Sequence, residues 1–448
     1  MVKRTLIKNI QIINEGEITT NNLLIEDGKI AEIGANADEN ADLVIDGTGK
    51  YLIPGIIDGQ VHFRDPGLTH KADLNTETRA AVAGGVTAFM DMPNTVPNVL
   101  TEEILEDKYT NAAGKSLANY GFFMGINMDN MDEVLSKDTS KFFALSDDGL
   151  YFTKKGNLLA DNTDKLDELF AKSEAIIALH SEKEGVVFAN EDEYKKIYGE
   201  DIPFRLHPEV RSVDACYQAT KELTKLAEKH DARLHVLHLT TAAETKFFRN
   251  DIPLAEKKIT TEVCVQHLWF SQEDYERLGS KIKWNPAIKF KEDKEGLLAA
   301  LVDDRIDLIT TDHAPHTVEE KSGNYFHAMS GAPMIQHSLN VMLEFYKQGK
   351  ISLEKIVEKM CHNPAQLYEI ENRGFIREGY AADLVIVDLD QVWTVTKESL
   401  HYKCGWSPME GQEFHGKVMQ TFVNGNLVYD NGAFNEEVKG QRLKKKGH

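Results

Sequence analysis

Long apolar runs are missing from this chain of 448 residues. No stretch approaches the roughly 20 apolar residues that a helix needs to cross a bilayer. Its first residues break their apolar run with Lys8 and Asn9, so they lack the core of a signal peptide. There is no internal repeat and no low-complexity linker. We therefore expect a cytoplasmic, globular protein that does not bind a membrane.

Cysteine is also scarce, and basic residues are outnumbered by acidic ones. The cysteines are far apart and form no CxxC pair, which argues against a disulfide framework or a zinc knuckle. The net charge of −21 argues against a nucleic-acid binder, because attraction to phosphates needs a basic surface. The basic cluster at 442–446 is typical of a solvated tail. A small anionic substrate would therefore need a local positive pocket.

Both ends of the chain are rich in short strands with turn signals, and the length suits one large domain plus a smaller one. Neither end has enough strands for a core of its own. We therefore predict that residues 1–53 and 371–448 together form one small β-sandwich. The predicted strands are Leu6–Ile13, Asn22–Glu26, Ile30–Ile33, Leu43–Asp46, Ala382–Val387, Trp393–Val395, Val418–Asn424 and Leu427–Tyr429.

The middle of the chain, 54–370, alternates short apolar strands with helical segments. This alternation predicts an α/β fold, a parallel barrel of about eight strand–helix units. Catalytic groups in such barrels lie where strands end and loops begin. The strands are predicted at Thr87–Met92, Tyr120–Asn127, Lys141–Leu145, Ile176–His180, Arg233–Leu239, Ile259–Val265 and Leu308–Thr311, and helices include Thr76–Gly84, Asp164–Lys172, Val213–His230, Lys294–Asp303 and Leu353–Met360.

The run from Asp58 to Gly67 follows an apolar strand and is the most informative segment. Side chains two positions apart share one face of a strand, so we expect Gln60, His62 and Arg64 to point the same way. Imidazole is a metal ligand, and a guanidinium group binds anions through a planar fork. This strand end therefore predicts a metal held beside an anionic substrate.

Other histidines and aspartates stand at the ends of later predicted strands, namely Asp147, Asp148, His180, His238 and Asp312. Each one alone also fits a structural role, as a hydrogen-bonded histidine, a turn residue or a helix cap. Their occurrence at successive strand ends instead favours a catalytic metal site with a position open for water. Metal binding lowers the pKa of that water to about 7, and a carboxylate can then carry its proton to a leaving nitrogen.

Three motifs of the chain resemble the amidohydrolase superfamily and, within it, the dihydroorotases. They are Thr311-Asp312-His313-Ala314-Pro315-His316, Val61-His62-Phe63-Arg64-Asp65-Pro66-Gly67 and Met92-Pro93-Asn94-Thr95. The resemblance runs over nearly the whole chain. It implies a distorted (β/α)8 TIM barrel with a composite β-sandwich, and one or two Zn²⁺ ions per subunit. It also allows a homodimer or an association with aspartate transcarbamoylase.

The resemblance also implies roles for individual residues. The implied metal ligands are His62, Asp148, His180, His238 and Asp312, with Asp147 as the alternative to Asp148. Asp312 would also be the catalytic acid and base. The substrate would be held by His62, by a carboxylate clamp of Arg64, Asn94 and His316, and by Asn285 at the ring.

The implied reaction is the reversible cyclisation of N-carbamoyl-aspartate to dihydroorotate, a step of pyrimidine biosynthesis. One residue departs from the pattern, because Gln60 stands where the family usually has the first histidine of His-x-His. An amide oxygen is a weaker ligand for zinc than an imidazole. We therefore predict that the metal on the Gln60 side binds more weakly, or that the site holds a single zinc.

Two other functions remain open. A different cyclic amidase, such as a hydantoinase or an allantoinase, would share the metal ligands but need not share Arg64, Asn94 and His316. A non-catalytic subunit that supports aspartate transcarbamoylase would explain Gln60, although such copies typically lose several ligands and Asp312 is kept. The metal is also open, since zinc, cobalt and manganese accept this ligand set.

Overall fold

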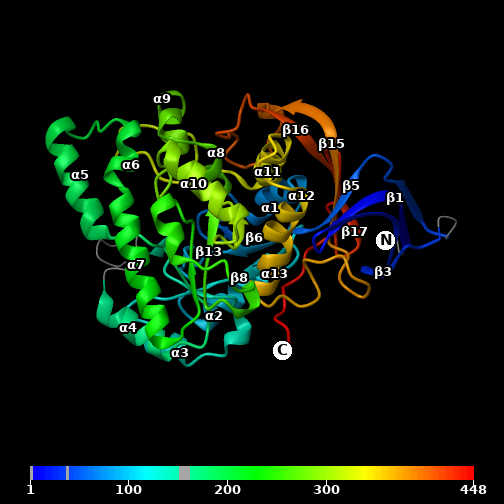
Figure 1. The fold of residues 1–448 in the computed structure, drawn as a ribbon, viewed down its shortest axis with the longest axis horizontal. Coiled ribbons are helices and arrows are strands. Elements are labelled where there is room, and N and C mark those ends of the chain that lie inside the picture. Colours follow the sequence, from blue (N-terminus) through cyan, green and yellow to red (C-terminus); the bar gives the residue numbers. More distant parts are fainter. Residues whose placement is uncertain (1–3, 37–39, 151–161, 448) are drawn as a thin grey trace.

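The computed structural model of the protein describes residues 4–36, 40–150 and 162–447. In this part of the chain the strands form one large mixed sheet and two smaller parallel sheets. Figure 1 shows the N-terminal strands, in blue, beside the orange C-terminal strands at one side of the molecule. Helices α4 (Thr163–Lys172) and α7 (Val213–His230), in green, lie at the opposite side.

The large sheet combines strands from both ends of the chain. Strand β5 joins them, because it pairs with β1 in parallel (Gln11 with Tyr51) and with β15 in antiparallel (Leu384 with Pro54). The two chain ends therefore share one sheet, while the domain boundaries at 53 and 371 stay a prediction. The strands of the large sheet are β1 (Arg4–Asn14), β2 (Glu17–Glu26), β3 (Lys29–Ile33), β4 (Leu43–Asp46), β5 (Tyr51–Pro54), β15 (Leu384–Thr394), β16 (Glu413–Val423), β17 (Asn426–Asp430) and β18 (Ala433–Phe434).

The two smaller sheets contain the strands of the middle of the chain, and every neighbouring pair in them is parallel. A parallel bridge between Val61 and His313 joins the end of β6 to the residues after β14. The carboxyl ends of these strands therefore point to one side. The strands are β6 (Ile56–Val61), β7 (Val86–Asp91), β8 (Asn119–Phe122), β9 (Met124–Gly125), β10 (Leu145–Ser146), β11 (Ile177–Leu179), β12 (Leu234–Val236), β13 (Ile259–Cys264) and β14 (Leu308–Thr310).

Helices alternate with these strands, as the sequence predicted. Helix α7 shows why: Ser212 caps its first turn by accepting from the Ala215 backbone N–H, and its small and apolar residues recur at helical spacing on the buried face. The other α-helices are α1 (Leu74–Ala83), α2 (Glu102–Ala112), α3 (Met131–Leu135), α5 (Glu184–Tyr198), α6 (His207–Val210), α8 (Val265–Trp269), α9 (Tyr275–Leu278), α10 (Lys291–Val302), α11 (Ser338–Lys347), α12 (Leu353–Val357) and α13 (Asn363–Leu367).

Some predicted boundaries are wrong. The strand predicted at Lys141–Leu145 is a short 3₁₀ turn followed by β10, and the strand predicted at Tyr120–Asn127 is broken at Phe123. Strand β6 ends at Val61, so strand alternation does not extend to Arg64, whose φ of +65° lies in the left-handed region. Local apolar content marked these segments, but tertiary packing decided where each strand stops.

None of the helices in the described part of the chain has the length and apolar character that crossing a membrane requires.

Candidate active site

Five of the side chains predicted as metal ligands converge at the carboxyl ends of the parallel strands. They form two overlapping groups, Asp148 with His180 and His238, and Asp148 with His62 and Asp312. In each group, one potential ligand atom of every residue lies within 4.8 Å of the others. All five residues are buried, and Asp148 is common to both groups. The arrangement can hold a metal ion in either group.

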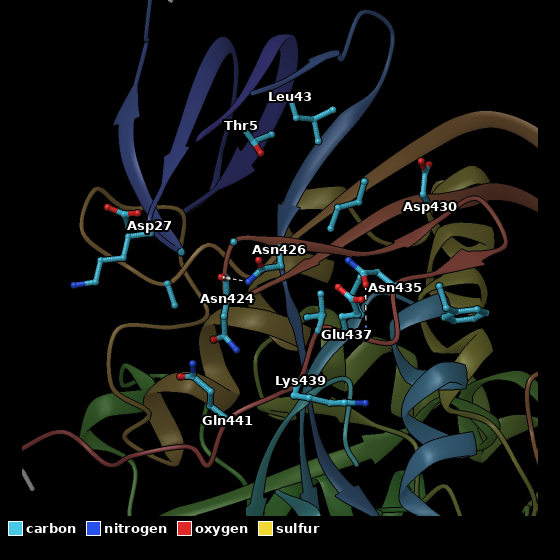
Figure 2. Close-up of a pocket in the computed structure, with 18 of the residues that line it drawn as sticks. Thr5, Asp27, Leu43, Asn424, Asn426, Asp430, Asn435, Glu437, Lys439 and Gln441 are labelled. Carbon is cyan, nitrogen blue, oxygen red and sulfur yellow. Dashed lines mark hydrogen bonds between the residues drawn. The ribbon is translucent and has the colours of Figure 1, made fainter. Parts of the chain in front are cut away.

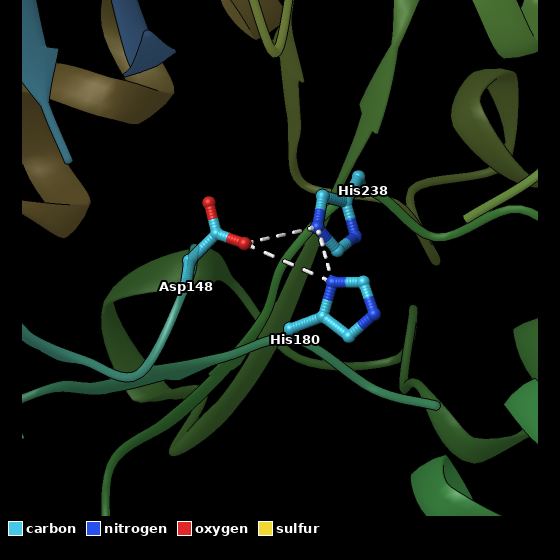
Figure 3. A group of neighbouring side chains, drawn as sticks. All are labelled: Asp148, His180 and His238. Atoms are coloured by element: carbon cyan, nitrogen blue, oxygen red, sulfur yellow. Dashed lines mark hydrogen bonds and ion pairs between the residues drawn. The ribbon is translucent and has the colours of Figure 1, made fainter. Parts of the chain in front are cut away.

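The first group brings two imidazole nitrogens and a carboxylate oxygen face to face (Figure 3). Nδ1 of His180 lies 3.1 Å from Nε2 of His238, and Oδ1 of Asp148 lies 3.7 and 3.8 Å from these two nitrogens. On the other side of the His180 ring, Nε2 lies 2.8 Å from Oε2 of Glu182. Because the carboxylate can only accept, Nε2 of His180 donates and Nδ1 turns its lone pair toward the group.

Glu182 stays ionised despite its burial. Burial raises the pKa of this carboxyl, but Arg211 and the hydrogen bond from His180 hold that pKa well below its ordinary value. A carboxylate behind a histidine orients the ring and raises its basicity toward a metal. The first group therefore fits a divalent cation such as zinc in its donor set and its ring orientation.

The second group places an imidazole between two carboxylates. Nε2 of His62 lies 3.0 Å from Oδ1 of Asp312 and 3.2 Å from Oδ2 of Asp148. Burial lowers the pKa of His62, but its hydrogen bonds to Asp148 and Asp312 outweigh this and raise the pKa to about 9. Nδ1 of His62 lies 2.8 Å from Oδ1 of Asn94, which orients the ring. Two carboxylates that attract a proton so strongly also suit a metal cation.

Gln60 lies beside this group and already uses both ends of its amide. Its Nε2 donates to Oδ2 of Asp148 at 3.2 Å, and its Oε1 accepts from Sγ of Cys264 at 4.0 Å. In this orientation the amide presents N–H groups, not an oxygen, toward Asp148. Gln60 therefore acts on the site as a hydrogen-bond donor in this structure.

Arg64 and His316 lie together near these groups. Nη2 of Arg64 is 3.3 Å from Nε2 of His316, and Nε of Arg64 donates to the carbonyl of Pro315. Arg64 is buried, yet no carboxylate among the described residues lies within ion-pair distance of it. A buried guanidinium without an anionic partner is suited to receive one from a ligand.

The remaining predicted substrate residues lie at two different places. Asn94 lies against His62, as described above. Asn285 follows Trp284, whose Nε1 donates to the carbonyl of Asp312 at 3.4 Å. Oδ1 of Asn285 is buried and has no hydrogen-bond partner among the described residues. It is therefore open to a donor on a bound molecule.

Three of the site residues have left-handed backbone conformations. The φ angles are +65° at Arg64, +36° at His238 and +43° at Asp312. Such angles are uncommon for residues with a Cβ atom and concentrate at functional sites. Here these angles occur just after a strand ends, at residues whose side chains turn into the site.

Two residues near the site were missed at the sequence level. Glu182 stands two positions after His180, and this spacing was a usable signal because side chains two apart share one side of an extended segment. Lys71 contacts His316, but it lies in a loop and only the tertiary structure brings it there. A buried pair adjoins the site as well: Nε2 of His235 lies 3.1 Å from Oε2 of Glu262, and Oε1 of Glu262 accepts from the backbone N–H of His238.

A separate cavity of about 1390 Å³ lies between the first strands of the large sheet and the last part of the chain (Figure 2). It is lined by acidic residues such as Asp27 and Glu437 together with basic ones such as Lys29 and Lys439. The five candidate metal ligands are not among its described lining residues. The cavity is therefore distinct from the site above.

Potential metal ligands at the carboxyl ends of parallel strands stand where the catalytic groups of such α/β folds lie. A model of the amidohydrolase family matches residues 51–428, and the chain belongs to this family. It is thus a hydrolase of the class that acts on cyclic amides.

Relatives and solved structures agree on the family. The chain is 30% identical over 425 residues to the dihydroorotase of Pyrococcus furiosus, covering 94% of this chain and 92% of that protein. It is 32% identical over 435 residues to the dihydroorotase of Bacillus cytotoxicus, covering 95% and 98%. The structure matches an L-hydantoinase from Arthrobacter aurescens with a TM-score of 0.91, at 26% identity and with 99% and 100% coverage. It also matches the fold of a dihydropyrimidinase from Brevibacillus agri with a TM-score of 0.86, at 24% identity and with 98% coverage of both chains.

Proposed function

We propose that the protein is a zinc-dependent dihydroorotase, which interconverts N-carbamoyl-L-aspartate and (S)-dihydroorotate in de novo pyrimidine biosynthesis. The observation that carries this proposal is the setting of Arg64, a buried cation without a carboxylate partner among the described residues. It lies beside His316 and near the two groups of potential metal ligands. Dihydroorotate is a cyclic amide with a carboxylate, and Arg64 suits that carboxylate. The dihydroorotase names of the sequence relatives support the same substrate.

The proposal includes the finer architecture. The parallel strands would form a distorted (β/α)8 barrel over 54–370, closed where β6 meets β14, and 1–53 with 371–448 would form a composite β-sandwich. The bridge between Val61 and His313 and the sheet shared by the two chain ends support this division. We also propose a cytoplasmic location and a homodimer.

Zinc would be held by Asp148, His180 and His238, with a second, weaker position at Asp148, His62 and Asp312. The chemistry that zinc supplies when bound is the acidification of a water molecule and the polarisation of a carbonyl group. Glu182 and Asn94 would fix the rings of His180 and His62 for this purpose.

The protein's own residues would then bind the substrate and move the proton. Arg64 and His316 hold the carboxylate of the ring through charge-assisted hydrogen bonds. Oδ1 of Asn285 accepts from a ring N–H. The carboxylate of Asp312 takes the proton of the attacking water and delivers it to the departing ring nitrogen. In the reverse direction the same carboxylate removes the proton from the attacking nitrogen.

The test is turnover of dihydroorotate by purified, zinc-loaded protein, followed by the loss of ultraviolet absorbance on ring opening. Asp312→Ala should abolish turnover, whereas Asp251→Ala, at an exposed position paired with Arg249, should leave it unchanged. Hydantoin and allantoin serve as competing substrates, because the match to an L-hydantoinase favours another cyclic amidase as the second candidate.

Each outcome decides between the candidates. Preference for dihydroorotate supports the proposal, and turnover of hydantoin or allantoin alone replaces it with the second candidate. A folded, zinc-loaded protein without turnover of any of these would point to a non-catalytic subunit. Co-purification with aspartate transcarbamoylase would then be the next measurement.

A further inference from the structure

We propose that Lys71 is a positioning residue for substrate binding, which fixes the tautomer of His316 so that His316 and Arg64 donate together to one anionic group. This inference rests on the proposed function, because the anionic group would be the carboxylate of the substrate ring. It assigns a role to a loop residue that lies outside the three sequence motifs.

Lys71 lies in the loop between Arg64 and helix α1, and it is only 7% exposed. Its Nζ is 3.1 Å from Nδ1 of His316 and 3.0 Å from Oε1 of Glu320. A lysine ammonium group has three donors and no acceptor. Nδ1 of His316 can therefore only accept from Lys71, which is its nearer partner, while Oε2 of Glu320 lies 3.3 Å from the same nitrogen. The bond to Lys71 places the proton of a neutral ring on Nε2.

Nε2 of His316 faces Nη2 of Arg64 at 3.3 Å. The guanidinium group also has donors only. Two N–H donors that face each other cannot satisfy one another, but both can bond to an oxygen atom placed between or beside them. A carboxylate supplies such oxygen atoms and balances the buried charge of Arg64. Trp406 keeps His316 in place, because its Nε1 donates to the His316 carbonyl at 2.8 Å.

The opposite tautomer is disfavoured by the charges around the ring. The charged groups that face His316 are Arg64, Lys71, Lys321 and Glu320. Burial and the three cations together outweigh Glu320 and hold the pKa of His316 well below its ordinary value, so the ring is neutral and carries one proton. If that proton were on Nδ1, it would face the ammonium group of Lys71 at 3.1 Å, and the acceptor left to it would be Oε2 of Glu320 at 3.3 Å, on a carboxylate that already pairs with Lys71.

Replacing Lys71 should therefore move the proton of the neutral His316 ring from Nε2 to Nδ1. In Lys71→Met, Nδ1–H of His316 can donate to Oε2 of Glu320, which lies 3.3 Å away, and Nε2 then accepts from Arg64. The carboxylate of the substrate loses one donor. We expect KM for dihydroorotate to rise about tenfold or more, as for the loss of one charge-assisted hydrogen bond, with kcat nearly unchanged. Lys71→Arg should recover part of the affinity, and the exposed Lys291→Met should behave as wild type.

A second measurement reports the tautomer without any substrate. In protein labelled with ¹⁵N-histidine, the ring nitrogen shifts of His316, assigned by their loss in His316→Gln, distinguish Nε2–H from Nδ1–H. We expect Nε2–H in the wild type and Nδ1–H in Lys71→Met.

The two measurements separate the inference from the proposed function. A wild-type ring with its proton on Nδ1, or an unchanged KM in Lys71→Met, would overturn the role of Lys71. If the wild type does not turn over dihydroorotate, the proposed function fails, and the NMR measurement alone still decides whether Lys71 sets the tautomer. An increase in KM that is equally large for a cyclic amide without a carboxylate would also overturn the inference, since it would indicate a general loss of structure.

Discussion

Glu182 and His180 are bound to each other inside the protein, with Oε2 of the glutamate 2.8 Å from Nε2 of the histidine. Both side chains are fully buried. The pair fixes which nitrogen of His180 faces Asp148 and His238. The ligand atoms of the first group are therefore oriented toward one another before any metal binds.

Removing the charge of Glu182 should weaken metal binding without removing a ligand. For Glu182→Gln we expect a loss of about 10- to 100-fold in zinc affinity, because the ring loses its anionic partner. Competition with a chelator of known affinity measures this loss. Exposed Glu276→Gln is the matched control. Equal zinc affinities in the Glu182 variant and the wild type would show that the carboxylate does not tune His180.

The number of bound metals should depend on Gln60. The amide donates to Oδ2 of Asp148 and does not offer an imidazole to the second group. We expect about one tightly held zinc per chain in the wild type, and about two in Gln60→His, because imidazole is the stronger ligand. Elemental analysis after dialysis against a mild chelator measures the ratio. Two zinc ions that survive this dialysis in the wild type would contradict the prediction.

The guanidinium group of Arg64 should matter by its shape as well as its charge. Arg64→Lys keeps the charge but removes the planar fork, so we expect a loss of about 1–3 kcal/mol in transition-state binding. The ratio of kcat/KM values for dihydroorotate gives this loss. Turnover like that of the wild type would remove Arg64 from the substrate site.

Stability should depend on pH through Glu244, which is buried. Its side chain is hydrogen-bonded to threonines and not to the candidate metal ligands. It accepts from Thr220 and Thr241, but burial outweighs these bonds and raises its pKa to about 7 from 4.5. A raised pKa means that the folded state favours the protonated form. The contribution to stability is therefore complete below pH 4.5 and is lost as the pH rises through about 7.

Glu244→Gln should remove this dependence. Relative to the variant, the metal-free wild type should lose up to about 3 kcal/mol of unfolding free energy between acidic and mildly alkaline pH. Urea unfolding at pH values on both sides of this window measures the difference, with Glu276→Gln as the control. Parallel pH profiles for wild type and Glu244→Gln would show that Glu244 does not titrate in this range.

Much of the candidate site was accessible from the sequence, because potential ligands stand at the ends of successive predicted strands and the family resemblance gave them roles. The resemblance implied the ligands His62, Asp148, His180, His238 and Asp312, with Asp147 as the alternative to Asp148, and the structure brings these five together. The helix predicted at 213–230 was correct to the residue, since its cap and its apolar spacing are local features. The strand predicted at 141–145 was wrong because a short apolar run does not by itself determine where pairing begins.

The sequence by itself determined the identity of the potential ligands and their order along the chain, because ligand chemistry belongs to residue types and strand ends follow local apolar patterns. Only the tertiary structure decided which groups distant in the sequence face one another: Asn94 behind His62, the amide of Gln60 toward Asp148, and Lys71 against His316. These contacts join residues whose positions depend on packing and on the backbone turns at Arg64, His238 and Asp312. A proton position or an amide orientation follows from such contacts, and no local pattern in the chain specifies it.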